Sequence, residues 1–472
     1  MKAGFSKKKI TPDLGIIMAG HPGTKYAKRI RDDLFVRVAA INNDVETVVF
    51  ASLDVLFVEV ESVRYIKESV SKKINIKSEN IFISATHTHS GPMTTGLFGK
   101  EQESGYIVYL HSQTIEAVIE AVIDLKSCKV GFGKTEAKGF AFNARFLMEN
   151  GKVETHPFKY DKAIVGPEGP VDDTFSFIYF YDENGSLFGG IINYANHPQI
   201  MERQDPSISA DFPGEIEKNI LIKHNKEAVV LFTNGTCGDI CPVNAMDSTK
   251  CEVGEQWLAY MGKELANKAN EILNNKCEVS DLLLNCLSGE IELTIRDISN
   301  ELIDKASEFL KYHNEEDKLL VSNYGVENEG SAFISLEEYL HTNEWLVQKY
   351  TDLLELYKIK EKNSSEKIKI TALEICGIGM VMLPFEVFVE LGLEIKRRSP
   401  YKNTIVAELT NGSLGYIPTE KAFNRDGGYE TITLRSSRFK EESGKLIVEK
   451  AIELLNELYS RKINNVDKQY KI

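Results

Sequence analysis

Two histidines lie one residue apart in the segment ISATHTHSGP, where an apolar run ends in a Ser-Gly-Pro turn. In an extended chain, side chains alternate between two faces, so His87 and His89 are expected on the same side. Two imidazoles held together can bind one metal ion, or one can bind the metal while the other contacts a substrate. A hydrogen-bonded pair of histidines with a structural role is the alternative interpretation.

Four further segments place chemically active side chains directly after apolar runs, where α/β proteins tend to bind ligands. They are NYANHPQIM with His197, FTNGTCGDICP with Cys241, VMLPFEVF with Glu386 and LTNGSLGYIPT with Tyr416. Each also has a structural interpretation: Glu386 suits the start of a helix, which we expect over residues 386–398, and Cys241 suits a buried thiol in a tight turn. Two histidines, one carboxylate and one open position suit a catalytic zinc ion.

The elements that must position these residues alternate between strands and helices over the first 275 residues. Apolar, β-branched runs predict strands at 35–42 and 47–58, and apolar residues at helical spacing predict helices at 62–74 and 106–125. Two apolar runs around Glu183-Asn184-Gly185 predict a β-hairpin. Because helix-linked strands occur together with a hairpin, we expect an α/β fold with mixed sheets flanked by helices.

A change in pattern near residue 276 predicts two lobes. Residues 1–275 would form an α/β lobe that carries the histidines, and residues 276–472 an α/β lobe that carries Glu386 and Tyr416. Residues of about 300–365 are highly charged and have helical periodicity, so they predict a helical insertion in the second lobe. A solvated helical hairpin is the favoured interpretation of this insertion, and a regulated lid is the alternative.

The composition excludes several kinds of partner. The net charge is −14, which disfavours binding to nucleic acid or to anionic lipid headgroups. Seven cysteines without a dense paired framework favour reduced thiols. The N-terminus lacks the pattern of a signal peptide, and no apolar run is long enough for a transmembrane segment, so we expect a soluble cytoplasmic protein. The sequence gives no indication of the oligomeric state.

Taken together and in this order, the segments resemble the neutral (non-lysosomal) ceramidase family. AGFSKKKITPDLGIIMAGH resembles the family's opening segment, and ATHTHSGP, NHP, GDICP, PFE and GYIPT follow it in the family's order. The THTHSGP block is the most specific of these. The resemblance covers nearly the whole chain and implies the family's catalytic domain, a zinc-dependent hydrolase of a ceramide-like or smaller lipid or acyl amide.

The resemblance also implies roles for individual residues. The implied zinc ligands are His87, His197, Glu386 and Tyr416. A zinc ion lowers the pKa of its bound water to about 7, so hydroxide is available at neutral pH to attack the amide carbonyl.

Three more residues match active-site positions of the family. His89 is the expected general acid for the leaving amine, and Tyr429 and Arg145 are expected to help it stabilise the oxyanion. Asp211 and Asp239 are expected to orient the histidine ligands through hydrogen bonds.

The sequence departs from the family pattern at several points. Cys241 stands where the family has the serine of Gly-Asp-x-Ser-Pro, and Phe385 replaces the glycine of the family's P-G-E segment. We also expect the secretory signal and the C-terminal β-sandwich of the family to be absent, which weakens ceramide in an outer membrane leaflet as the substrate. Two alternatives therefore stay open: a metal-independent cysteine hydrolase that uses Cys241 with His89, and a non-catalytic zinc- and lipid-binding relative.

Overall fold

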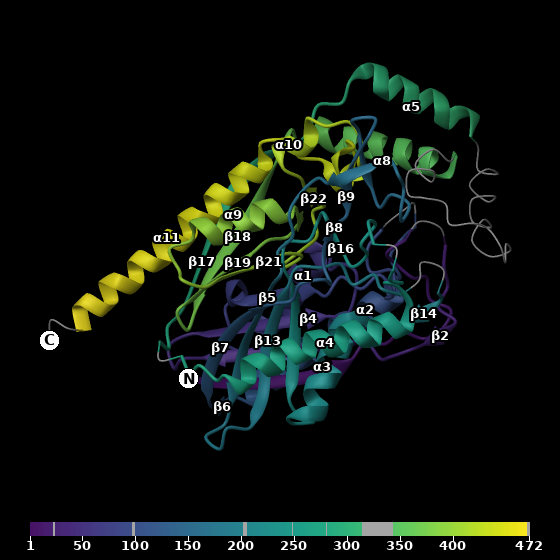
Figure 1. Cartoon of the computed structure of the whole chain (residues 1–472). Coiled ribbons are helices and arrows are strands. Elements are labelled where there is room, and N and C mark those ends of the chain that lie inside the picture. The colour runs from purple at the N-terminus through teal and green to yellow at the C-terminus, as the bar shows by residue number, and fades with distance from the viewer. Residues whose placement is uncertain are drawn as a thin grey trace.

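The structure is a computed structural model of the chain. It describes residues 1–21, 24–96, 100–201, 205–247, 249–279, 281–313 and 343–469. Three mixed sheets and the helices that cover them make up most of the described part (Figure 1). The predicted α/β class with mixed sheets is therefore confirmed.

The first sheet has five strands and carries the His87 segment at one end. Its strands, in spatial order, are β5 (Ile81–Ala85), β4 (Thr47–Leu53), β3 (Phe35–Asn42), β1 (Lys2–Lys9) and β6 (Lys126–Ser127). Only the β4–β5 pair is parallel, and it is linked by helix α1 (Val60–Lys73). Apolar side chains of α1 and of α2 (Ser104–Ile123) pack with those of the sheet in one core cluster. The predicted strand at 47–58 is too long, because β4 ends just before Asp54, whose carboxylate pairs with Arg37.

The second sheet has four strands and carries His197. Its strands are β15 (Val229–Asn234), β13 (Leu187–Tyr194), β12 (Thr174–Tyr181) and β7 (Lys129–Glu136). β12 and β13 pair antiparallel on either side of the predicted turn, so the hairpin is confirmed. Apolar side chains of α3 (Asp211–Lys223) and α4 (Gly254–Asn274) join those of this sheet in another core cluster.

The third sheet carries the Glu386 segment. Its strands are β17 (Leu284–Thr294), β18 (Ser365–Ile375), β19 (Ile378–Met382) and β21 (Thr404–Ala407). Helices α9 (Val389–Arg398) and α11 (Ser443–Gln469) pack on it. Side chains of all three sheets meet in one shared core, which fixes the sheets relative to one another; it includes Ile41, Ile191 and Met382.

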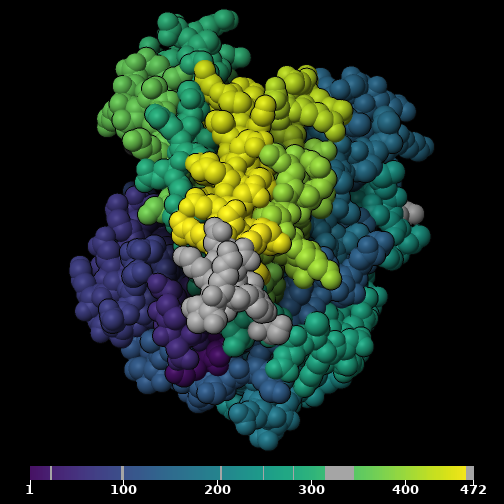
Figure 2. Space-filling view, turned by 90° about the vertical axis from the view of Figure 1, so that its left-hand side faces the viewer, coloured from purple at the N-terminus to yellow at the C-terminus, as the bar shows by residue number. Residues whose placement is uncertain are grey.

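Helices α5 (Asn300–Tyr312) and α8 (Asn343–Lys362) lie between β17 and β18 in the sequence. They pack on each other and form a projection at one end of the molecule (Figures 1 and 2). Both fall in the predicted helical insertion, of which residues 314–342 lie outside the described part of the chain. The division into two lobes near residue 275 stays a prediction.

Short elements connect the sheets around the predicted site residues. Two two-residue strand pairs lie there: β20 (Glu386–Val387) with β22 (Tyr416–Ile417), and β16 (Ile240–Cys241) with β8 (Phe142–Asn143). The other short elements are β2 (Arg29–Ile30), β9 (Arg145–Met148), β10 (Val153–Thr155), β11 (Ile164–Pro167), β14 (Ser207–Ile208), α10 (Glu420–Phe423), η1 (Ser78–Asn80), η2 (Tyr429–Thr431) and η3 (Arg435–Ser437). Among the described helices, none is long and apolar enough to cross a membrane.

Candidate metal centre and active site

Three histidines from two sheets converge at the ends of their strands. The ligand nitrogen atoms of His87, His89 and His197 all lie within 4.8 Å of one another. His87 and His89 follow β5, and His197 follows β13, so the expected placement after apolar strands is confirmed. The Nε2 atoms of His87 and His89 are 3.4 Å apart.

The backbone brings His87 and His89 together in a different way from the one expected. The segment is not extended at His87, which has a φ of 71°, in the left-handed region that non-glycine residues rarely adopt. Its N–H donates to the carbonyl of Val55, which helps to hold this conformation. Backbone strain of this kind persists only where the surrounding structure holds the residue in place, and it is common at functional sites.

Backbone carbonyls set the orientation of two of the rings. The Nδ1 atom of His87 lies 3.0 Å from the carbonyl oxygen of Leu56, and that of His89 lies 2.8 Å from the carbonyl oxygen of Gly20. A carbonyl only accepts hydrogen bonds, so each Nδ1 carries a proton, and the Nε2 atoms of the two rings lie 3.4 Å apart in the centre. This arrangement is usual for histidines that bind a metal ion.

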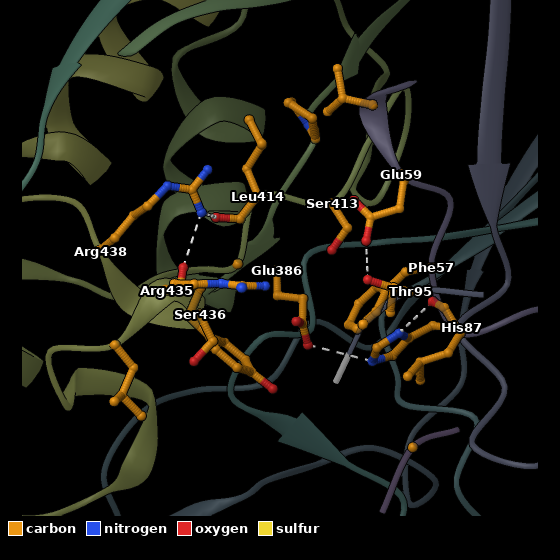
Figure 3. Close-up of a pocket in the computed structure, with 18 of the residues that line it drawn as sticks. Phe57, Glu59, His87, Thr95, Glu386, Ser413, Leu414, Arg435, Ser436 and Arg438 are labelled. Carbon is orange, nitrogen blue, oxygen red and sulfur yellow. Dashed lines mark hydrogen bonds and ion pairs between the residues drawn. The ribbon is translucent and has the colours of Figure 1, made fainter. Parts of the chain in front are cut away.

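Glu386 brings a carboxylate to the same centre. Its Oε2 lies 3.4 Å from Nε2 of His87 (Figure 3). The same oxygen lies 3.7 Å from Nε2 of His197. Burial disfavours the charged form of Glu386, but its contacts with His197 and His87 outweigh burial and lower the pKa of its carboxyl to about 2. The centre therefore holds a buried carboxylate in contact with two imidazole rings.

The predicted helix start at Glu386 is wrong. Glu386 lies in strand β20, and helix α9 begins at Val389. Its N–H donates to the carbonyl of Gly415, and Glu386 pairs in register with Tyr416 of β22. This pairing holds the backbone extended and puts the carboxylate and the phenol side by side.

Two tyrosines stand next to the carboxylate. The hydroxyls of Tyr416 and Tyr429 are 3.0 Å apart, and both side chains line the cavity described below. Burial, together with the nearby charge of Glu386, raises the pKa of Tyr416 well above its usual range. Tyr416 thus lies beside Glu386, and its role as a fourth metal ligand stays a prediction.

The donor set fits a metal ion. The Oε2 atom of Glu386 is buried and receives no hydrogen bond within the described part of the chain. Burial, and then the neighbouring histidines, lower the pKa of His89 well below its usual value, so this ring is neutral at neutral pH. Converging imidazole nitrogens and a carboxylate are ligands that suit zinc.

Arg145 is fully buried away from the cavity. Its guanidinium contacts Glu168 and Glu430, each at 2.5 Å, and does not line the cavity. Glu430 follows Tyr429 directly, so these contacts hold the segment that carries this tyrosine. A Cβ at Gly428 would lie 1.9 Å from Nη1 of Arg145, so a glycine is required at this close approach. A direct role of Arg145 at the oxyanion stays a prediction, and its contacts favour a positioning role.

Cys241 is also outside the cavity lining. Its thiol is buried and donates a weak hydrogen bond to the carbonyl of Val243, at 3.2 Å. Burial raises the pKa of this thiol to about 12, so it is protonated at neutral pH. These are the properties of an inert buried thiol.

Asp211 and Asp239 support loops and do not contact the three histidines. Asp211 accepts hydrogen bonds from the N–H groups of Ile200 and Met201, directly after the His197 segment. Asp239 accepts from the N–H of Val389, at 2.7 Å, where α9 begins. The carbonyls of Leu56 and Gly20 fill the orienting role that the sequence assigned to the aspartates, at least for His87 and His89.

Two further histidines lie at the site without having been selected from the sequence. His21 and His156 line the same cavity, and the ring of His21 is 5.2 Å from that of His89. Burial, and then His197, lower the pKa of His156 to about 4. The chain has only nine histidines, so their scarcity was the signal that could have pointed to these two.

The centre opens into a large cavity of about 2050 Å³. Figure 3 shows part of its wall: Phe57 lies against His87, and Glu59 is bonded to Thr95. On the other side, Leu414, Arg435, Ser436 and Arg438 come from the loops around β22 and η3. A substrate of considerable length fits in a cavity of this size.

Comparison with known proteins gives one family and one fold. The family model described as neutral/alkaline non-lysosomal ceramidase, N-terminal, matches residues 2–287. The neutral ceramidase from Pseudomonas aeruginosa has 17% identity and a TM-score of 0.70, over 97% of this chain and 74% of that one. A structure described as a ceramidase complexed with C2 has 16% identity and a TM-score of 0.71, over 98% of this chain and 75% of that one. No curated protein matches the sequence.

Proposed function

This chain belongs to the neutral/alkaline non-lysosomal ceramidase family, and from this premise we propose that it is a zinc-dependent hydrolase of a linear N-acyl amide. The substrate class is a ceramide-like or smaller lipid amide. One observation supports the proposal: His87, His197 and Glu386 converge as buried nitrogen and oxygen donors, and His87 and Glu386 line a large cavity.

The metal ligands in this proposal are His87, His197, Glu386 and Tyr416. His89 lies close enough to be a fifth donor, but its place beside the cavity also suits a role in proton transfer. A zinc ion supplies a Lewis acid and a bound water whose pKa is near 7.

The protein's own groups then have distinct tasks. The Nδ1–H of His89 is held by the carbonyl of Gly20, so its Nε2 is free to take up a proton and give it to the leaving amine. The phenol of Tyr429 faces the cavity and can donate a hydrogen bond to the oxygen that becomes negative. Arg145 and Glu430 keep Tyr429 in place.

The geometry disfavours the two alternatives. A cysteine hydrolase needs Cys241 as an accessible thiolate, whereas this thiol is buried, protonated and outside the cavity lining. The exchange of serine for cysteine likewise removes no group from the cavity wall, so it gives no reason for a loss of turnover. The cytoplasmic location stays a prediction from the sequence.

The experiment is a hydrolysis assay on the zinc-loaded protein with N-octanoylsphingosine and N-octanoylethanolamine. The release of octanoate is the measured signal. Removal of the metal with a chelator should abolish hydrolysis, and added zinc should restore it. Alkylation with iodoacetamide should leave the rate unchanged. Activity that survives complete metal removal and is lost on alkylation would overturn the proposal in favour of the cysteine enzyme.

A further inference from the structure

The cavity extends from the metal centre into a groove between α1 and the sheet of β17 and β18. One face of α1 lines it, with residues at helical spacing. These residues are Val60, Val63, Arg64, Lys67 and Glu68. The opposite wall is β18, whose residues Lys367, Lys369 and Thr371 alternate along one face of the strand.

Lys67 is a partly buried lysine of this groove. Within the described part of the chain it forms no ion pair or hydrogen bond, although it is only partly exposed. Burial, and then the charge of Lys369, lower the pKa of Lys67 to about 8. Glu79 and the thiol of Cys286 also face it, but Cys286 is neutral, because burial raises its pKa to about 12.

Two arginines of the same cavity are neutralised by carboxylates. Arg435 pairs with Glu355 at 2.6 Å, and Arg438 pairs with Glu366 at 2.8 Å. The lysines of the groove differ from these arginines: Lys67 and Lys369 interact electrostatically, and within the described part of the chain neither forms an ion pair, although Glu79 lies near Lys67. Two like charges held together at a cavity wall favour an anion between them.

Hydroxyl groups lie beside the lysines. The side-chain oxygens of Ser288 and Thr371 are 2.9 Å apart on paired strands, and both residues line the groove. Because only one of the two hydroxyls donates in their shared bond, the other is available to donate to a ligand. The groove thus offers ammonium and hydroxyl donors, which suit the oxygens of a carboxylate or a phosphate.

The groove lies at a fixed distance from the metal centre. The ring of Phe57 is 5.0 Å from that of His87, and α1 begins three residues later. Lys67 is seven residues after Val60, which is about 10 Å along a helix axis. A substrate whose amide lies at His87 would reach Lys67 with a chain of moderate length.

We propose that Lys67 and Lys369 bind an anionic group, a carboxylate or a phosphate, carried by the substrate. A chain of moderate length would separate this group from the scissile amide. The preferred substrates are then N-acyl amides with such a group rather than neutral ceramides, whose alkyl chains would have to cover these charged walls. This inference rests on the proposed function for the site of cleavage, but anion binding can be measured without it.

The experiment measures binding of octyl phosphate, octanoate and octanol to the zinc-loaded protein by calorimetry. The wild type should bind at least one of the two anions ten or more times more tightly than octanol, and the better anion identifies the source of the charge. Lys67→Met should abolish this preference, and Lys67→Arg should keep it. Lys72→Met is the matched control, since Lys72 is exposed on the same helix and does not line the cavity.

Equal binding of the anions and octanol would overturn the proposal. An anion preference that persists in both Lys67→Met and Lys369→Met would overturn it as well, because the anion would then bind at the metal. If Lys67→Met fails to fold, Lys369→Met, on an exposed face of β18, provides the test alone. A protein that binds the anions through Lys67 but hydrolyses no amide would refute the proposed function and leave this inference standing.

Discussion

The two ends of the cavity gather opposite kinds of groups. At the metal centre, His87, His197 and Glu386 bring nitrogen and oxygen donors together. In the groove, Lys67 and Lys369 bring two cations near each other, and neither forms an ion pair within the described part of the chain. A cation suits the first set of groups, and an anion suits the second.

A buried cluster elsewhere in the molecule shows what a completed set of charges looks like. Arg37 contacts Asp54 at 2.6 Å and Glu217 at 2.8 Å, and Lys7 contacts the same glutamate at 2.7 Å. This cluster needs no ligand, and its role is to hold β3 against neighbouring elements. Charged groups that are gathered but not neutralised are therefore the better guide to binding sites in this chain.

The largest effect is expected when a predicted metal ligand is replaced. Glu386→Gln keeps the shape of the side chain but removes its charge, so kcat/KM for an N-octanoyl amide should fall about a thousandfold, or about 4 kcal/mol. Glu390→Gln, in the first turn of α9 and outside the cavity lining, is the matched control. Steady-state kinetics measure both, and a loss of less than tenfold in Glu386→Gln would contradict the role given to this carboxylate.

An intermediate effect is expected from raising the pH, which removes the charge of Lys67 in the groove. The pKa of Lys67 is lowered to about 8, so the ammonium is lost as the pH rises through that value. Octanoate keeps its charge throughout this range, so its Kd should rise about tenfold between pH 7 and pH 9. A bound anion stabilises the ammonium of Lys67, so it would raise the pKa of this group and move the pH range of the effect upward.

Lys67→Arg sharpens this test, because a guanidinium stays charged at both pH values. Its Kd for octanoate should be nearly the same at pH 7 and pH 9. If the wild type and Lys67→Arg show the same pH dependence, another group titrates, and the assignment to Lys67 is wrong.

The smallest effect is expected at Cys241. A serine can make the same hydrogen bond to the carbonyl of Val243, so Cys241→Ser should change kcat/KM by less than about twofold and destabilise the fold by about 1 kcal/mol. Thermal unfolding and kinetics check the two values. A large loss of activity with an unchanged melting temperature would show that this thiol takes part in the reaction.

The motifs predicted much of the site because each one follows a buried strand. His87 and His89 share one segment, while His197, Glu386 and Tyr416 come from three others, and the structure brings them close together. Strand ends on packed sheets meet at a shared edge, so separate motifs of this kind converge. The metal-binding roles themselves stay predictions.

The remaining features of the site could not be predicted, because they depend on contacts between segments that are far apart in the sequence. Glu386 follows an apolar run and precedes a helix, and only its pairing with Tyr416, thirty residues later, makes it a strand residue. Arg145 looked like an active-site cation, but Glu430 binds it from 285 residues away. Lys67 has the pattern of a solvated lysine on an amphipathic helix, and β18, which faces it across the groove, lies some 300 residues further along the chain.

In the proposed function, the gathered histidines and Glu386 bind a metal ion. Elemental analysis of the purified wild type, beside His87→Ala and Glu386→Gln, measures this metal directly. We expect about one zinc ion per chain in the wild type, with most of it lost in both variants. A wild type that stays free of metal after purification in zinc, or variants that keep their zinc, would contradict the account.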